Sequence, residues 1–158
     1  MKIKSVLSKL FSSKGFTLIE LLIVIAIMGV LAAGILVAID PVDKISAAND
    51  SRVQNDISGA GRASEAYATV HNGFYPADYP DLVTSGELKR APVSPTGYNA
   101  YTKVNTPAGC TAGTTCTGIL FSGQLKSKRF TSVGTPFWNY DSATGKSCSA
   151  VAANSTCP

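Results

Sequence analysis

The feature that most constrains this chain is an apolar run near its N-terminus, from Phe16 to Ile39. As an α-helix the run would be about 36 Å long, enough to cross a bilayer core about 30 Å thick. It carries one ionisable side chain, Glu20. A carboxylate in such a segment costs about 2–4 kcal/mol, and less toward the end of the span, where Glu20 lies. We therefore predict a membrane-spanning helix in which Glu20 has a partner.

The segment before the apolar run is basic and contains no acid. Its charged residues are Lys2, Lys4, Lys9 and Lys14. The positive-inside bias predicts that this end stays in the cytoplasm and that the C-terminal part is exported. A secretory signal peptide cleaved near Ala32-Ala33 is one alternative, but its apolar core is normally about 7–15 residues long. An uncleaved membrane anchor is the other alternative.

The formal charge of +4 belongs to this basic leader. The 158-residue chain has 14 Lys and Arg against 10 Asp and Glu, and four of those bases are the leader lysines. Residues 16–158 are therefore close to neutral, so the overall basicity does not indicate a nucleic-acid-binding protein. Once the apolar run is set aside, the remaining length is enough for one modest domain.

The junction between leader and apolar run resembles the class III signal of type IV prepilins and their pseudopilin relatives. It reads Lys14-Gly15-Phe16-Thr17-Leu18-Ile19-Glu20, with a basic leader ending in Gly, an apolar residue after it and Glu at the fifth position beyond the Gly. The resemblance implies that a prepilin peptidase cleaves between Gly15 and Phe16 on the cytoplasmic side and N-methylates Phe16. It also implies that the apolar helix stays attached and packs into the core of a homo-oligomeric helical filament.

The same resemblance implies a partner for Glu20. In the family this Glu is thought to pair with the N-terminus of a neighbouring subunit during assembly, and the amine released on Phe16 would supply that positive charge. A contact within one turn of its own helix is the alternative.

Two helical segments are expected before the head. Pro41 ends the first one, because proline cannot donate a backbone hydrogen bond and disfavours the helical conformation of the residue before it. Residues 42–70 are polar with an apolar stripe at helical spacing, which predicts an amphipathic helix. The stripe comprises Val53, Ile57, Ala60, Ala63, Tyr67 and Val70. A soluble amphipathic helix that continues a membrane helix resembles the long spine of pilins.

Glycines lie in both expected helices. In related pilins the membrane half loses helical structure on assembly, so the resemblance implies a helix break around Gly29, Gly34 and Pro41 in the filament. Gly59 and Gly61 each weaken the second helix by about 1 kcal/mol relative to Ala. We interpret these two as tolerated substitutions rather than as sites of close packing.

The rest of the chain predicts a small head. Residues 71–76 (HNGFYP) end the second helix with a Gly followed by a Pro, and the pattern NG-x-YP again resembles pilins. Short strand candidates at 97–104, 118–125 and 135–141 predict an antiparallel sheet of three or more strands, with a short helix or turn at 82–88 and a linker at 91–95. The sheet would pack on the apolar stripe, giving an α+β pilin fold. Four aromatic residues are expected in the core: Phe121, Phe137, Trp138 and Tyr140.

Four cysteines in an exported domain predict two disulfides. The spacing favours the local pairs Cys110–Cys116 and Cys148–Cys157, although three connectivities are open. The 148–157 loop resembles the C-terminal disulfide-bounded loop of many pilins. Zinc is not expected, because the cysteine spacings are too long and no histidine accompanies them. His71, the only histidine, is expected in a solvent-exposed loop.

Charge is unevenly distributed outside the leader. Residues 16–90 hold nine acids and five bases, whereas residues 91–158 hold five bases and one acid, Asp141. Calcium needs several oxygen ligands, so the C-terminal calcium site that major pseudopilins of type II secretion have is not expected here. The opposite charges could help subunits stack head to tail. Lys126-Ser127-Lys128-Arg129 is interpreted as a solvated turn, in preference to a contact with DNA phosphates.

We therefore expect a leader (1–15), a transmembrane and filament-core helix (16–40), an amphipathic helix (41–72) and a globular head (73–158). The expected function is a structural subunit of a type IV pilus, anchored in the cytoplasmic membrane as a precursor and extracellular after assembly. Such pili serve adhesion, twitching motility or DNA uptake. A pseudopilin of a secretion or competence system is the alternative. A membrane-anchored enzyme is disfavoured because no catalytic constellation is visible, and no cofactor is expected.

Overall fold

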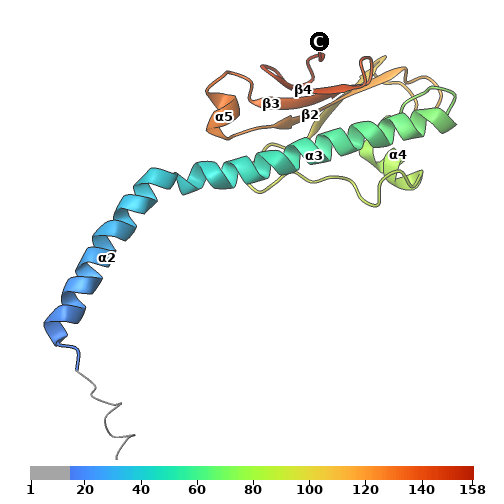
Figure 1. Ribbon diagram of the computed structural model, residues 1–158. Coiled ribbons are helices and arrows are strands. Elements are labelled where there is room, and N and C mark those ends of the chain that lie inside the picture. The colour runs from blue at the N-terminus through green and yellow to red at the C-terminus, as the bar shows by residue number, and fades with distance from the viewer. Residues whose placement is uncertain (1–14) are drawn as a thin grey trace, which may run out of the picture. The chain divides into compact units, whose positions relative to one another are not determined.

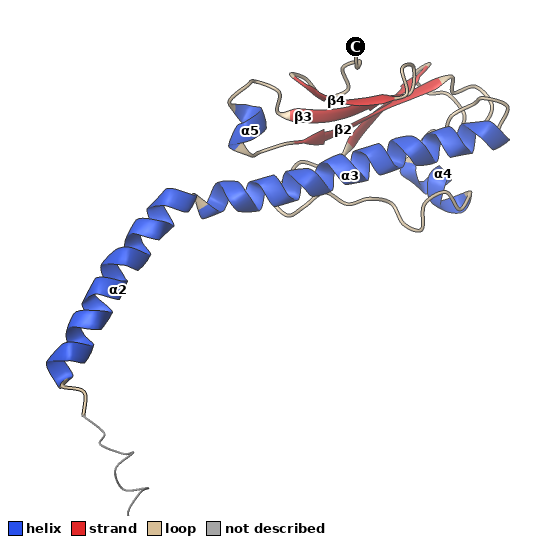
Figure 2. Cartoon of the chain, in the orientation of Figure 1, coloured by secondary structure: helices blue, strands red, loops and turns tan. Residues whose placement is uncertain are grey.

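The computed structural model describes residues 15–158 (Figures 1 and 2). The expected leader lies outside the described residues, except for Gly15. The chain divides into two compact units on either side of the link between Asp40 and Pro41, and each unit is described by itself.

The first unit is built on helix α2, Leu18–Ile39, which runs without interruption through Gly29 and Gly34. Asp40 follows it with a left-handed backbone (φ 44°), and α3 begins at the next residue, Pro41. The segment Leu18–Leu36 has a mean hydropathy of 2.7 and is long and apolar enough to cross a membrane. All α2 side chains that the structure describes are exposed, so the described part of this helix buries no apolar side chain.

The second unit is built on helix α3, Pro41–Val70, packed against one antiparallel sheet (Figure 1). Five members of the apolar stripe predicted from the sequence are buried on this face: Val53, Ile57, Ala60, Ala63 and Tyr67. The prediction was wrong for the sixth member, because Val70 is 69% exposed. Val70 is the last residue of the helix.

The sheet has four antiparallel strands in the order β1-β2-β3-β4. The strands are β1 Thr102–Thr106, β2 Gly118–Gln124, β3 Phe137–Asp141 and β4 Lys146–Ala150. Strand β4 has no counterpart among the three strand candidates, because Lys-Ser-Cys-Ser-Ala lacks the β-branched and aromatic residues that mark a strand. Its pairing with β3, from Phe137–Ala150 to Asp141–Lys146, supplies what local propensity does not.

The core lies between α3 and the inner face of the sheet. Phe121 on β2 and Tyr140 on β3 are a paired register position and are 0% and 3% exposed. Trp138 is half-buried against this core and donates a hydrogen bond from Nε1 to Ser58 Oγ (3.1 Å). Phe137 is half-buried but is not part of the core cluster. The prediction of four core aromatics is thus confirmed for Phe121 and Tyr140, met in part by Trp138, and wrong for Phe137.

A short C-terminal segment covers the outer face of the sheet. Asn139 on β3 donates hydrogen bonds from Nδ2 to the carbonyl oxygens of Ala152 (3.0 Å) and Ser155 (2.9 Å). Asn154 reaches the edge strand and donates to Thr102 Oγ1 (3.1 Å). The segment ends in the disulfide between Cys148 and Cys157. The second disulfide joins Cys110 to Cys116 in the connection between β1 and β2.

Two local predictions need correction. The short helix α4 is Tyr79–Thr84, earlier than the expected 82–88, because Asp78 and Asp81 form a capping box that starts it. His71 is half-buried, not solvent-exposed: its ring stacks on Tyr67 with centroids 3.8 Å apart, and Nδ1 lies 2.8 Å from Tyr67 O.

Gly61 is a site of close packing, contrary to the interpretation from sequence. A Cβ atom at this position would overlap the ring of Tyr140, whereas a Cβ at Gly59 would meet nothing within 4 Å. The absence of a side chain at Gly61 therefore lets α3 approach β3. At Gly59 the structure agrees with the interpretation that the helix merely tolerates a glycine.

We predict opposite effects for the two Gly→Ala substitutions. Gly61→Ala should destabilise the folded head by about 1–3 kcal/mol, because the Tyr140 ring must move in a packed core. Gly59→Ala should stabilise it by about 0.5–1 kcal/mol, because alanine is the better helix former and nothing is displaced. Urea unfolding of the detergent-solubilised protein measures both. Equal effects of the two substitutions would show that Gly61 is not a packing site.

Candidate functional site: the N-terminal segment and the anchored basic loop

The predicted cleavage site lies just before the first turn of α2. Gly15 and Phe16 precede the helix, and Phe16 is 75% exposed. The bond between them is therefore in non-helical, accessible backbone, as a protease substrate requires. Within the described part of the chain a Cβ at Gly15 would meet nothing within 4 Å, so packing against these residues does not demand glycine at this position.

Glu20 forms a capping box with Thr17 at the start of α2. Glu20 Oε2 accepts hydrogen bonds from the Thr17 backbone N–H and from Thr17 Oγ1, both at 2.8 Å. Thr17 Oγ1 in turn accepts from the Glu20 N–H at 3.3 Å. This is the contact within one helical turn that the sequence left as an alternative. The carboxylate satisfies a backbone donor that would otherwise be unpaired at the helix end.

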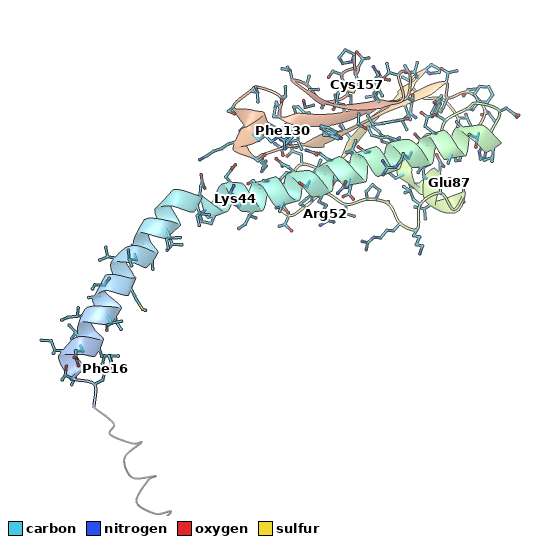
Figure 3. The ribbon with its side chains drawn as sticks, in the orientation of Figure 1. Phe16, Lys44, Arg52, Glu87, Phe130 and Cys157 are labelled. Carbon is cyan, nitrogen blue, oxygen red and sulfur yellow. A yellow bond between two sulfur atoms is a disulfide. The ribbon has the colours of Figure 1, made fainter. Side chains whose placement is uncertain are left out.

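The apolar surface of α2 is the largest exposed hydrophobic feature of the described chain (Figure 3). Its Leu, Ile and Val side chains range from 41% exposed at Val24 to 82% at Leu18. Each such side chain gains about 1.5–3 kcal/mol when it leaves water. The helix therefore requires lipid or other protein around it.

In the head, Asp50 fixes the basic loop, residues 126–129, which carries Lys126, Lys128 and Arg129. Asp50 is a buried acid on α3, 1% exposed. It accepts hydrogen bonds from the backbone N–H groups of Lys126 (2.9 Å) and Ser127 (2.8 Å) and from Tyr98 Oη (2.8 Å). Desolvation, and next the hydrogen bond to Asp50, raise the pKa of Tyr98 well above its usual value. The backbone of the predicted solvated turn is thus anchored, while the side chains of Lys126, Lys128 and Arg129 are exposed.

Sequence reasoning missed Asp50, although a signal was present. It precedes Val53 and Ile57 by three and seven residues, which places it on the buried face of the helix. A second acid, Asp43, anchors the next residue of the loop by accepting from the Lys128 N–H at 2.7 Å. Lys128 begins the short helix α5, Lys128–Thr131.

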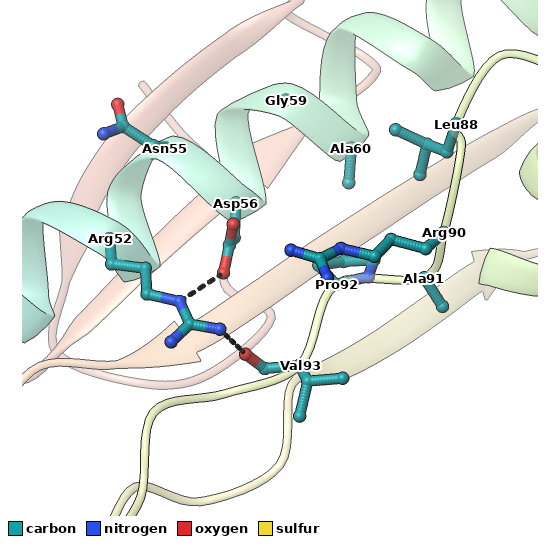
Figure 4. Close-up of a pocket in the computed structure, with 10 residues that line it drawn as sticks. All are labelled: Arg52, Asn55, Asp56, Gly59, Ala60, Leu88, Arg90, Ala91, Pro92 and Val93. Atoms are coloured by element: carbon teal, nitrogen blue, oxygen red, sulfur yellow. Dashed lines mark hydrogen bonds and ion pairs between the residues drawn. The ribbon is translucent and has the colours of Figure 1, made fainter.

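A groove of about 420 Å³ lies between α3 and the 88–93 segment (Figure 4). Arg52 on its wall donates from Nη2 to Val93 O (3.0 Å), and its Nε lies 3.7 Å from Asp56 Oδ2. The same Asp56 oxygen accepts from Tyr101 Oη (2.8 Å). These contacts hold the linker against α3. No His, Cys, Ser or Lys lines the groove, and its one carboxylate, Asp56, is engaged with Arg52 and Tyr101.

Among residues 15–158, no group of three or more His, Cys, Asp or Glu side chains is arranged to hold a metal ion. Asp141, the only acid of the C-terminal region, is buried and turned toward backbone donors. It accepts from the Ala143 N–H (2.8 Å) and the Cys157 N–H (3.3 Å). Its carboxylate therefore secures the C-terminal disulfide segment.

Replacing Asp50 by Asn should loosen the basic loop. The amide keeps the size but offers one acceptor oxygen to three donors, so we expect a loss of about 1–3 kcal/mol in the free energy of unfolding. Amide hydrogen exchange at Lys126 and Ser127 should speed up. Glu87→Gln, which removes a charge elsewhere on the head, is the matched control. Unchanged exchange in the Asp50 variant would contradict the anchoring role.

Comparison with known proteins adds one finding about the N-terminal segment. The sequence profile of the prokaryotic N-terminal methylation motif matches residues 10–36, which include Gly15, Phe16 and Glu20. Comparison of the chain with curated proteins and with solved structures gives no match. The head, with its long helix, four-stranded antiparallel sheet and two disulfides, is consistent with the α+β pilin fold. The chain therefore carries the class III signal of type IV pilins and pseudopilins, ahead of an α+β head whose fold is consistent with that of pilins.

Proposed function

We propose that this protein is a structural subunit of a type IV pilus. The single observation that carries the proposal is the methylation motif placed directly before an uncovered apolar helix. Cleavage after Gly15 would remove the charged leader and leave the helix attached to the head. An assembly of parallel helices would then cover the apolar side chains of α2, as lipid does in the membrane-anchored precursor.

The proposed cleavage would create a positively charged amine on Phe16, close in sequence to Glu20. The amine released on Phe16 lies one residue before the Thr17 N–H, which Glu20 binds in the uncleaved chain. We infer that the methylated amine of one subunit pairs with Glu20 of its neighbour. Gly29, Gly34 and Pro41 are the positions at which we expect the helix to yield during assembly.

The composition of the head supports an exported location. Two disulfides, Cys110–Cys116 and Cys148–Cys157, are typical of proteins folded outside the cytoplasm. One closes a loop in the β1–β2 connection, and the other ties the C-terminal segment to strand β4, in which Cys148 lies. The proposed role is therefore structural, with the head presented on the filament surface.

Mass and N-terminal analysis of protein sheared from the cell surface tests the proposal. We expect long filaments of a chain that begins at N-methyl-Phe16, two hydrogens lighter than the reduced form for each of the two disulfides. The same processed chain confined to the membrane fraction would identify a pseudopilin instead. A chain that begins at Met1 would contradict both functions.

Gly15→Ala should reduce processing by the prepilin peptidase. Its Cβ meets no atom of residues 15–158 within 4 Å, so the substitution should spare the described fold, and we expect any effect to arise in the peptidase site. Immunoblotting for precursor and mature forms measures it. Gly34→Ala, at another glycine with open surroundings, is the control. Mature protein at full yield in the Gly15 variant would refute the cleavage assignment.

Glu20→Ala should leave the subunit processed and in the membrane but should impair filament assembly, because the neighbour's amine loses its counter-charge. Filament yield relative to total mature subunit is the measurement. Thr17→Val is a matched comparison: it removes the threonine hydroxyl from the capping box and keeps the carboxylate, so it should assemble better than Glu20→Ala. Normal filaments from the Glu20 variant would overturn the pairing.

A further inference from the structure

We propose that the basic loop, residues 126–129, binds the anionic headgroups of the membrane in which the subunit is anchored before assembly. The inference rests on the proposed membrane anchoring and goes beyond the proposed filament role. Lys126, Lys128 and Arg129 are all exposed, although the backbone of the loop is held by buried Asp50 and by Asp43. The loop is a fixed platform for the positive side chains of Lys126 and Arg129.

The covalent chain places this platform close to the membrane surface. Asp43, which binds the Lys128 N–H, is only four residues after Ile39, the last residue of α2. Four residues span about 6 Å if helical, and at most about 14 Å if extended. The headgroup layer on each side of a bilayer is about 5–8 Å thick. At the helical spacing, which α3 has from Pro41 onward, a loop tied to Asp43 lies within reach of phosphate groups.

The side chains of the loop can accept an anionic partner. Arg129 has its guanidinium 5.3 Å from the ring of Phe130, and no acid pairs with it among the described residues. Lys126 donates one hydrogen bond to Gly97 O and lies over the Tyr98 ring, which leaves two of its N–H groups for a ligand. Two acids accept hydrogen bonds from the backbone of the loop: Asp50, which is buried beneath it, and Asp43 at its edge.

The surroundings fit a lipid surface better than a soluble anion. Val42 and Ile45, in the first turns of α3, are 72% and 64% exposed, and Val133, just after α5, is 70% exposed. Lys44 is exposed in the same stretch of α3. Figure 3 places the Lys44 and Phe130 labels at the end of the head where α3 begins. Positive and apolar side chains together match the interface of an anionic bilayer.

Native valines allow a direct test with the whole mature chain in lipid nanodiscs. One set contains phosphatidylcholine alone and the other contains phosphatidylglycerol as well, and both carry a trace of lipid with a gadolinium chelate on its headgroup. Paramagnetic relaxation of valine methyl groups reports their distance from the headgroups. Val42 reports insertion, Val133 reports the basic loop, and Val70, at the opposite end of α3, is the remote reference.

We expect Val133 to relax at least about twofold faster in the anionic nanodiscs, and the difference to shrink at high salt, as screening of a surface charge contact requires. Lys126→Gln with Arg129→Gln should abolish the difference. The matched control, Lys89→Gln with Lys146→Gln, removes two exposed charges elsewhere and should keep it. Lys146 lies opposite Asp141 in the register of β3 and β4. This end of the two strands is the one farther along the chain from α5.

The possible outcomes distinguish the anchoring of the chain in the membrane from headgroup binding by the basic loop. Val42 unaffected in both nanodiscs would mean that the chain is not anchored, which would overturn the proposed function. Val42 relaxed but Val133 equal in the two lipids would leave the anchor intact and refute headgroup binding. The difference in Val133 relaxation between the two lipids could survive the double substitution or be lost equally in the control pair. Either result would assign the difference to overall charge rather than to the basic loop.

Discussion

An apolar helix that its own chain leaves uncovered sets the conditions for the rest of this protein. Side chains such as Leu18 and Val30, 82% and 75% exposed, are incompatible with a soluble monomer. The proposed cleavage after Gly15 fits this constraint because it would preserve the helix, whereas ordinary signal cleavage would discard it. In the proposed function lipid or neighbouring subunits cover the surface of the helix, so the chain from Pro41 onward must fold without help from it.

The head meets that requirement with small residues and buried polar anchors. Ala60, Gly61 and Ala63 let α3 approach the sheet closely, and the Tyr140 ring fills the space that Gly61 leaves. Glu65 accepts hydrogen bonds from Tyr75 Oη (3.0 Å) and Tyr140 Oη, tying the end of α3 to the sheet and to the chain beyond it. Desolvation, and next the hydrogen bond to Glu65, raise the pKa of Tyr75 to about 12. The protonated phenol is thus favoured in the folded state, and its contribution to stability is lost only as the pH rises from about 10 toward 12.

The parts that the sequence predicted are those in which a periodic pattern coincides with burial. The stripe from Val53 to Tyr67 follows the helical repeat, and the aromatic strand from Phe137 to Asp141 has strong local propensity. Strand β4 was missed because its pairing with β3, not its composition, makes it a strand. Asp50 and Gly61 were missed or misjudged for a related reason: their roles depend on partners 76 and about 80 residues away, which no local pattern reveals. The N-terminal signal needed no tertiary information, because a peptidase that acts on an accessible segment must recognise local sequence.

Glu20 can bind Thr17 in its own capping box or, in the proposed filament, the amine of a neighbouring subunit, and the two interactions differ in energy. In the uncleaved chain its carboxylate accepts from a neutral backbone N–H and a hydroxyl at 2.8 Å, and a hydrogen bond to a charged group contributes about 1.5–3 kcal/mol at most. A methylated ammonium adds a full opposite charge, and the attraction between two charges grows as water is excluded. In lipid, an unpaired amine is as costly as an unpaired carboxylate, so bringing the two together relieves both. We therefore infer that Thr17 holds the carboxylate in position until a neighbouring subunit presents its amine, and that the exchange favours assembly only after cleavage has created that charge.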